Sequence, residues 1–242
     1  MQVLSPRSVV VQTSGVGGGV HHDPARISAL SNLPAPTTGQ ELQQFVCALN
    51  WMRSSLPAFN KLIGPLVKMM EKVYERAGGR KKTQVRKVTF SDVGWGEAEV
   101  ASLENCKQSL QNALQIAHPG PEKLLSVFTD ASDEHWGAAI TQIPRDQAAR
   151  PLSKQEHQPL MMLSGLFSGA AKRWTIVEKE AYAIVETCRR ADFSFIDSMA
   201  LLFLLITGIC VSSLILTVFQ TRCPSIRRTN STVVTLANGL SV

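Results

Sequence analysis

The sequence predicts an α+β (α/β) protein in which a small helical part precedes a strand-rich part. Apolar residues recur at helical spacing before residue 118, whereas residues 124–167 carry short β-compatible runs separated by polar turns. Helical spacing then returns at 173–190. The chain has 242 residues, of which 44% are hydrophobic, so it is long enough for one or two modest domains with real cores.

The first predicted helix, at 38–52, has a well-marked start. Thr38 and Glu41 form a capping box, because each side chain can bond the backbone amide of the other residue. Apolar residues then follow at helical spacing: Leu42, Phe45, Val46, Leu49 and Met52. We therefore expect an amphipathic helix that buries this face.

A second helix is predicted at 63–79, with Pro65 near its first turn and a Gly-Gly pair as its stop. The two helices together predict a small helical subdomain at 21–79. Residues 1–20 are glycine-rich but lack the Lys-Ser/Thr ending of a phosphate-binding loop, so they are interpreted as a flexible entry. A third helix is predicted at 97–117 from the spacing of its apolar residues.

The segment RKKTQVRK begins a basic stretch at 80–94. A solvated linker is the favoured interpretation, because no aromatic residues are interleaved with the basic ones. Contact with phosphates nevertheless requires little more than such charge, and the formal net charge of +6 permits a polyanionic partner.

The cysteines are widely scattered and form no cluster with metal-ligand spacing: Cys47, Cys106, Cys188, Cys210 and Cys223. This distribution argues against a zinc site. We expect buried, reduced thiols, which suit the cell interior.

The strand-rich part contains VFTDASDEHW at 127–136. LLSVFTDAS and WGAAITQI predict an antiparallel hairpin whose first strand ends at Asp130, and PLMMLSGLF is compatible with a third strand. Taken alone, Asp130 fits either an ordinary turn or helix-capping residue or one half of a metal-binding pair. In the helix predicted at 173–190, Glu178 and Glu180 flank the apolar stripe on opposite edges, and spacing alone does not choose between them.

Several motifs in family order resemble a known polyprotein. HDPARISALSNLPAPTTGQELQQFVCALNWMRSSLPAFNKLIGPLVKMM is similar to the thumb/connection segment after the polymerase palm of gypsy-type long-terminal-repeat retrotransposons. FTDASDEHWGAAITQ and RWTIVEKEAYAIVE resemble the start of the ribonuclease H domain that follows it. The resemblance implies a truncated RNase H-like mixed sheet with a flanking helix at 95–193.

The family cleaves the RNA strand of RNA–DNA hybrids with two Mg²⁺ ions, which hard carboxylate oxygens bind well. Carried over by motif, the resemblance implies that Asp130 and Glu180 are the catalytic metal ligands. The ionisable residues near these two in the sequence are expected to be surface or turn residues: Asp133, Glu134, His135, Glu178 and Glu186.

Two family features are missing from the sequence. It contains no Asp-Asp pair of the polymerase type, so we do not expect DNA synthesis by this polypeptide alone. It also lacks the strand that ends in Thr-Asp-His and brings the third metal carboxylate. We therefore expect a catalytically incomplete nuclease with weakened Mg²⁺ binding, or a remnant that binds RNA–DNA hybrids without cleaving them.

An apolar tail at 194–242 stands where the missing strand belongs. Residues 199–219 carry no charge and are long enough, at about 1.5 Å per residue, to cross a bilayer as a helix. A membrane-anchored protein is thus one alternative. The other is a frameshift between 193 and 199, because codons allowed for MALLFLLITGIC, read one base earlier, encode HGFALFTDHRNLC and restore Thr-Asp-His.

Overall fold

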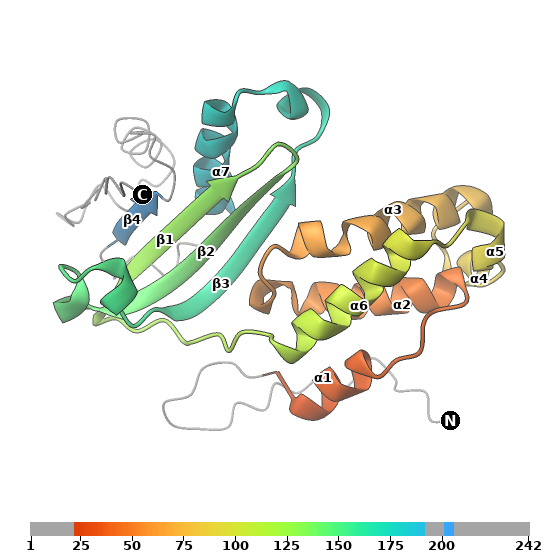
Figure 1. Ribbon diagram of the computed structural model, residues 1–242, viewed down its shortest axis with the longest axis horizontal. Coiled ribbons are helices and arrows are strands. Elements are labelled where there is room, and N and C mark those ends of the chain that lie inside the picture. Colours follow the sequence, from red (N-terminus) through yellow and green to blue (C-terminus); the bar gives the residue numbers. More distant parts are fainter. Residues whose placement is uncertain (1–21, 192–200, 206–242) are drawn as a thin grey trace.

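The computed structural model describes residues 22–191 and 201–205. Helices dominate the first part of the chain, and a sheet with one helix forms the second part (Figure 1). The helices of the first part are α1 (Pro24–Ser31), α2 (Gly39–Trp51), α3 (Phe59–Ala77), α4 (Lys82–Val85), α5 (Phe90–Val93) and α6 (Glu97–Gln111). The second part contains β1 (Lys123–Ala131), β2 (His135–Pro144), β3 (Gln158–Leu166), α7 (Ile176–Arg190) and β4 (Leu201–Leu205).

The predicted capping box starts α2. The Thr38 hydroxyl accepts a hydrogen bond from the Glu41 amide at 3.3 Å, and the Glu41 carboxylate accepts one from the Thr38 amide at 3.3 Å. Glu41 also accepts a 2.7 Å bond from the Thr37 amide, and the backbone bond from Thr37 is the main reason that its pKa is lowered. These bonds satisfy amides that a helix start leaves without intrahelical partners.

Helix α3 begins earlier than predicted, at Phe59, so Pro65 lies inside the helix rather than near its first turn. The start is set by Ala58, which has a left-handed φ of 49° and turns the chain after Pro57. The predicted stop is confirmed, because Gly78 adopts φ 66° and its amide bonds the carbonyl of Glu75.

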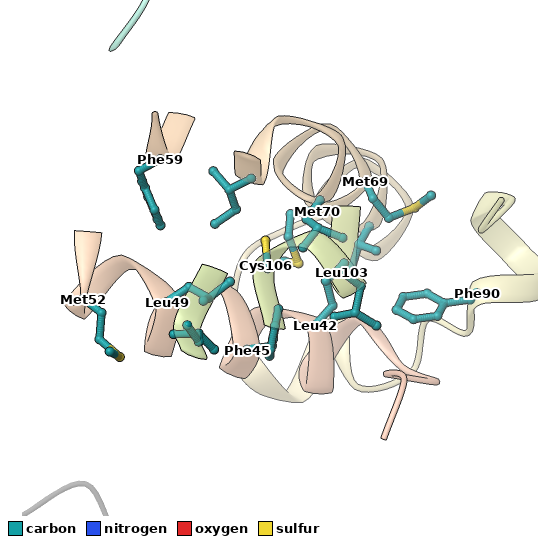
Figure 2. Packing of buried hydrophobic residues seen from close by; sticks show 14 of the residues in the cluster. Leu42, Phe45, Leu49, Met52, Phe59, Met69, Met70, Phe90, Leu103 and Cys106 are labelled. Atoms are coloured by element: carbon teal, nitrogen blue, oxygen red, sulfur yellow. The ribbon is translucent and has the colours of Figure 1, made fainter. Parts of the chain in front are cut away.

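The apolar faces of α2, α3 and α6 share one core, drawn in Figure 2. Its members include Leu42, Leu49, Met52, Leu66, Met69, Val73, Leu103, Cys106 and Leu110, all no more than 1% exposed. Burial raises the pKa of the Cys106 thiol to about 12, so this thiol is inert as expected. Cys47, in contrast, is exposed on α2.

The basic segment at 80–94 is more ordered than the predicted linker. It contains α4 and α5, and its apolar residues Val85 and Val88 are 0% and 5% exposed in the core of the helical part. Its basic side chains, by contrast, lie on the surface as expected: Arg80, Lys81, Lys82, Arg86 and Lys87. The segment therefore presents its charge from a fixed backbone.

The four strands form one sheet with the order β3-β2-β1-β4. The predicted hairpin is confirmed: β1 pairs antiparallel with β2, and Asp130 stands opposite Gly137. The predicted third strand is β3, which pairs antiparallel with β2. Helix α7 lies against one face of the sheet, where Ala183 packs with Ala131 and Trp136 (Figure 1).

The tail contributes β4, which pairs parallel with β1 and sets Leu205 beside Thr129. A helix that spans all of 199–219 is therefore wrong over residues 201–205, which are a strand, and the rest of that range lies outside the described residues. Within the described part of the chain, no helix is long and apolar enough to cross a membrane.

Hydrogen bonds join β3 to the chain that precedes the sheet. The amide of Asn60, in α3, donates to the Ser164 hydroxyl of β3 at 3.0 Å. Further along, the amide of Ala117, after α6, donates to the Pro159 carbonyl of β3 at 2.7 Å. These bonds fix β3 beside α3, as Figure 1 shows.

Candidate functional site

The start of α7 gives Glu178 a different role from Glu180, the other carboxylate that spacing alone did not exclude. Thr175 and Glu178 form a capping box: the Thr175 hydroxyl accepts from the Glu178 amide at 3.3 Å, and the Glu178 carboxylate accepts from the Thr175 amide at 2.7 Å. The bond from the Thr175 amide lowers the pKa of Glu178. Glu178 is thus exposed, as expected, and its carboxylate caps the start of α7.

Glu180 lies on the opposite edge of α7 and is only 2% exposed. Its Oε1 atom accepts a hydrogen bond from the Ala131 amide at 3.3 Å, whereas Oε2 is buried without a hydrogen-bond partner among the described residues. Burial raises the pKa of Glu180, and the nearby charge of Asp130 raises it further, against the lowering effect of the Ala131 amide. A buried carboxylate in this setting favours a proton or a cation.

Asp130 is exposed at the end of β1, one residue before the amide that binds Glu180. Its negative charge acts on Glu180 across the junction of β1 and α7. The structure thus brings together the two residues that the sequence motifs selected, although they are far apart in the chain. One of them faces solvent and the other is enclosed.

Asp133 and Glu186 were both expected at the surface, and only Asp133 lies there. Asp133 has a 99% exposed side chain in the turn between β1 and β2, as expected, and it pairs with Lys179. Glu186 was expected on the surface, but this is wrong, because it is 3% exposed. Its carboxylate is bound by Arg190 Nε at 2.7 Å and by Arg189 Nε at 3.3 Å, which is why its burial is tolerated.

The turn around His135 shows no ligand cluster. The Ser132 hydroxyl donates to the His135 carbonyl at 3.0 Å and closes the turn, so His135 is a turn neighbour as expected. Its pKa is lowered, mainly by burial; Lys61 and Lys68 lower it further, and Glu134 raises it. The backbone of His135, rather than its imidazole, therefore closes the turn.

Oxygen ligands for one divalent cation are present but few. The unpartnered Oε2 of Glu180 and the exposed carboxylate of Asp130 are the atoms that a hard cation would bind. Within 22–191 and 201–205, no group of three or more His, Cys, Asp or Glu side chains is arranged to hold a metal ion. The two carboxylates therefore suit Mg²⁺ in ligand type, but the described residues supply only these two acidic ligands.

Residues 95–198 match the family described as the RNase H-like domain found in reverse transcriptase. These residues belong to that family. The match begins before α6, although α6 packs in the core of the helical part. The sheet and α7 thus supply the RNase H-like fold, as the sequence motifs predicted.

Curated relatives are polyproteins of retroelements. The retrovirus-related Pol polyprotein from transposon opus of Drosophila melanogaster is 26% identical over 69% of this chain and 15% of its own length. The transposon Tf2-3 polyprotein of Schizosaccharomyces pombe is 25% identical over 64% of this chain and 10% of its own length. The enzymatic polyprotein of cauliflower mosaic virus (strain Strasbourg) is 24% identical over 62% of this chain and 19% of its length. The chain thus spans less than a fifth of each of these relatives.

Solved structures show the same fold. The foamy viral protease-reverse transcriptase in complex with ds DNA superposes with a TM-score of 0.63 and 16% identity, over 93% of this chain and 36% of that one. Its complex with RNA/DNA hybrid gives a TM-score of 0.60 at 16% identity, over 84% of this chain and 26% of that one. The helical part and the RNase H-like domain are therefore arranged as in a reverse transcriptase.

Proposed function

We propose that Asp130 and Glu180 are two ligands of a Mg²⁺ site that this chain leaves incomplete. The RNase H-like domain would then hold Mg²⁺ weakly and would not cleave RNA in RNA–DNA hybrids. The Oε2 atom of Glu180, buried and without a partner among the described residues, carries the proposal, because an ionised carboxylate oxygen beside a second carboxylate is costly to bury unless a cation binds there.

The two acids have different tasks in this proposal. Glu180 is held by the Ala131 amide, so its position is fixed before any ion arrives. Asp130 faces solvent, where it can complete the shell of an incoming ion. When bound, such ions activate water and stabilise the leaving oxygen of the phosphodiester.

The sequence of β4 supports the proposal of an incomplete site. This strand takes the place beside β1, and all five of its residues, Leu201–Leu205, are apolar. We propose that 194–242 is the product of a shifted reading frame. In the alternative frame the codons of β4 would encode Phe-Ala-Leu-Phe-Thr. Both frames therefore encode a β-compatible strand at this place. Only the alternative frame continues into Asp-His.

A cleavage assay tests the proposal directly. The purified chain is incubated with RNA–DNA hybrid and Mg²⁺, with Asp130→Asn as the matched control. We expect no cleavage above that of the control. Efficient Mg²⁺-dependent cleavage by the unaltered chain, abolished in Asp130→Asn, would contradict the claim of inactivity. Sequencing the transcript across the codons for 190–200 tests the shifted frame separately.

A second function, binding of a nucleic-acid backbone without cleavage, is favoured by the basic residues displayed at 80–87. They are exposed on a segment whose Val85 and Val88 are anchored in the core, so their charge is presented in a fixed arrangement. Each phosphate contact contributes about −0.9 to the slope of log K against log salt. Changing Lys81 and Lys82 to Ala is therefore expected to make the slope shallower by about 1 to 2.

Fluorescence anisotropy with a labelled hybrid at several salt concentrations measures this slope. Changing the exposed Lys154, near the sheet, to Ala is the control for overall charge. An unchanged slope in the Lys81/Lys82 variant, or an equal loss per charge in the control, would argue against the basic segment as the binding surface.

A further inference from the structure

The residue that precedes Glu180 on α7 is an almost completely buried lysine. The side chain of Lys179 is 4% exposed, although lysines are almost never buried unless they are paired. Its Nζ donates to Asp133 Oδ1 at 3.3 Å and lies 5.7 Å from the centroid of the Phe167 ring. The ammonium group is thus enclosed between the turn after β1 and the residue that follows β3.

Two contacts join α7 to the end of β1 and the turn that follows it. The Ala131 amide bonds Glu180, and two residues further along the turn Asp133 bonds Lys179. The amide of Phe167 in turn donates to the Glu134 carbonyl at 2.8 Å, which fixes the aromatic ring against this turn. The turn next to Asp130 is therefore held from α7 at two neighbouring positions.

We propose that Lys179 is a positioning residue that ties the β1–β2 turn to α7 and so keeps Glu180 beside Asp130. The inference rests on the proposed function only in treating these two acids as an ion site. Lys179 does not touch the ion in this account. Its contribution is that the buried ammonium group beside the Phe167 ring has the Asp133 carboxylate as its ion-pair partner, so leaving Asp133 would cost the buried charge that pairing.

The charge of Lys179, rather than its aliphatic stem, performs this task. The ammonium group stands over the Phe167 ring, and methionine would keep an apolar side chain of similar length there while removing the charge. Asp133 is 99% exposed, so its ion pair contributes little to global stability. The effect is expected to be local, at the Ala131–Glu180 bond, with the rest of the fold unchanged.

Amide hydrogen exchange of the metal-free full chain, followed by NMR, tests this role. Lys179→Met and Asp133→Asn are each expected to speed exchange of the Ala131 amide by about threefold to fivefold, the factor that one exposed ion pair typically supplies. Lys179→Arg is expected to restore near-normal protection. The amide of Val73, in α3, serves as the remote control and should not change.

The double variant Lys179→Met with Asp133→Asn should exchange no faster than either single variant, because both remove the same contact. Additive effects, or normal protection of Ala131 in Lys179→Met, would overturn the proposal. Titration of the wild type with Mg²⁺, read from the same amide, is a separate measurement. A wild type whose amide does not respond to Mg²⁺ counts against the proposed ion site, whereas the exchange rates still decide the role of Lys179.

Discussion

Replacing Glu180 by glutamine is expected to stabilise the protein at pH 8 and to leave its stability unchanged at pH 4. The pKa of Glu180 is raised above its ordinary 4.5, mainly by burial. The folded state therefore holds this proton more tightly than the unfolded state does. The stability of the wild type is highest below the unfolded pKa and falls as pH rises through the folded pKa, because a charge then has to remain buried. Glutamine carries no charge, so the Glu180→Gln variant does not lose stability in this way as pH rises.

The magnitude follows from the environment of the carboxylate, which is 2% exposed with Oε2 unpartnered. A buried polar group without a partner costs about 1–3 kcal/mol. The glutamine amide nitrogen would also lack a partner, so only the excess cost of the charge is recovered. We expect a gain of about 1 kcal/mol at pH 8, with the bond from the Ala131 amide retained.

Glu186→Gln is the matched control, because Glu186 is a second buried carboxylate on the same helix. It is 3% exposed but bound by Arg189 and Arg190, so its loss is expected to destabilise the protein by about 1–3 kcal/mol. Urea denaturation at pH 4 and pH 8 measures both variants. The reasoning would be refuted if Glu180→Gln lowered stability equally at both pH values, or if the two variants changed stability in the same direction at pH 8.

Four further substitutions test the packing and the helix start. Gly39→Ala is expected to cost about 1–3 kcal/mol, because the new Cβ would lie 2.8 Å from the Val85 carbonyl oxygen. Gly64→Ala adds a Cβ that meets no atom within 4 Å beyond its chain neighbours, so it should cost less than Gly39→Ala. Its gain in helix propensity is offset, because Gly64 precedes Pro65 inside α3 and the proline ring crowds a preceding Cβ. An equal loss at both positions by urea denaturation would contradict this account. Thr175→Ala should cost about 1 kcal/mol through loss of the α7 cap, and Thr175→Ser should restore most of it. Equal thermal midpoints for the alanine variant and the wild type would exclude a role for the cap.

Features that depend on contacts within a few residues could be predicted from the sequence. The predicted capping box at Thr38 and the predicted stop at Gly78 each involve groups no more than five residues apart. The hairpin around Asp130 follows for the same reason, because alternation and turn residues are local. The motif match added the pairing of Asp130 with Glu180, which no local pattern contains.

Features that depend on distant neighbours could not be predicted. Val85 and Val88 turn the basic segment from a linker into part of the helical core, because the core offers them an apolar surface built from other helices. Glu186 is buried on α7, and Arg190, which binds it, also stands against the sheet: its guanidinium carbon lies 5.1 Å from the centroid of the Trp136 ring. Lys179 gave no signal in the sequence, since its partner Asp133 is in a separate turn.

The sequence by itself determined the helical and strand-rich parts and the cap at Thr38, because these depend on spacing and residue type, whereas the choice of Asp130 and Glu180 came from the resemblance of their motifs to a family. The tertiary structure alone decided which acids are buried, which cations neutralise them, and that an apolar stretch of the tail pairs beside β1 as a strand. The physical reason is that the cost of burying a charge and the satisfaction of a strand edge are properties of the assembled fold.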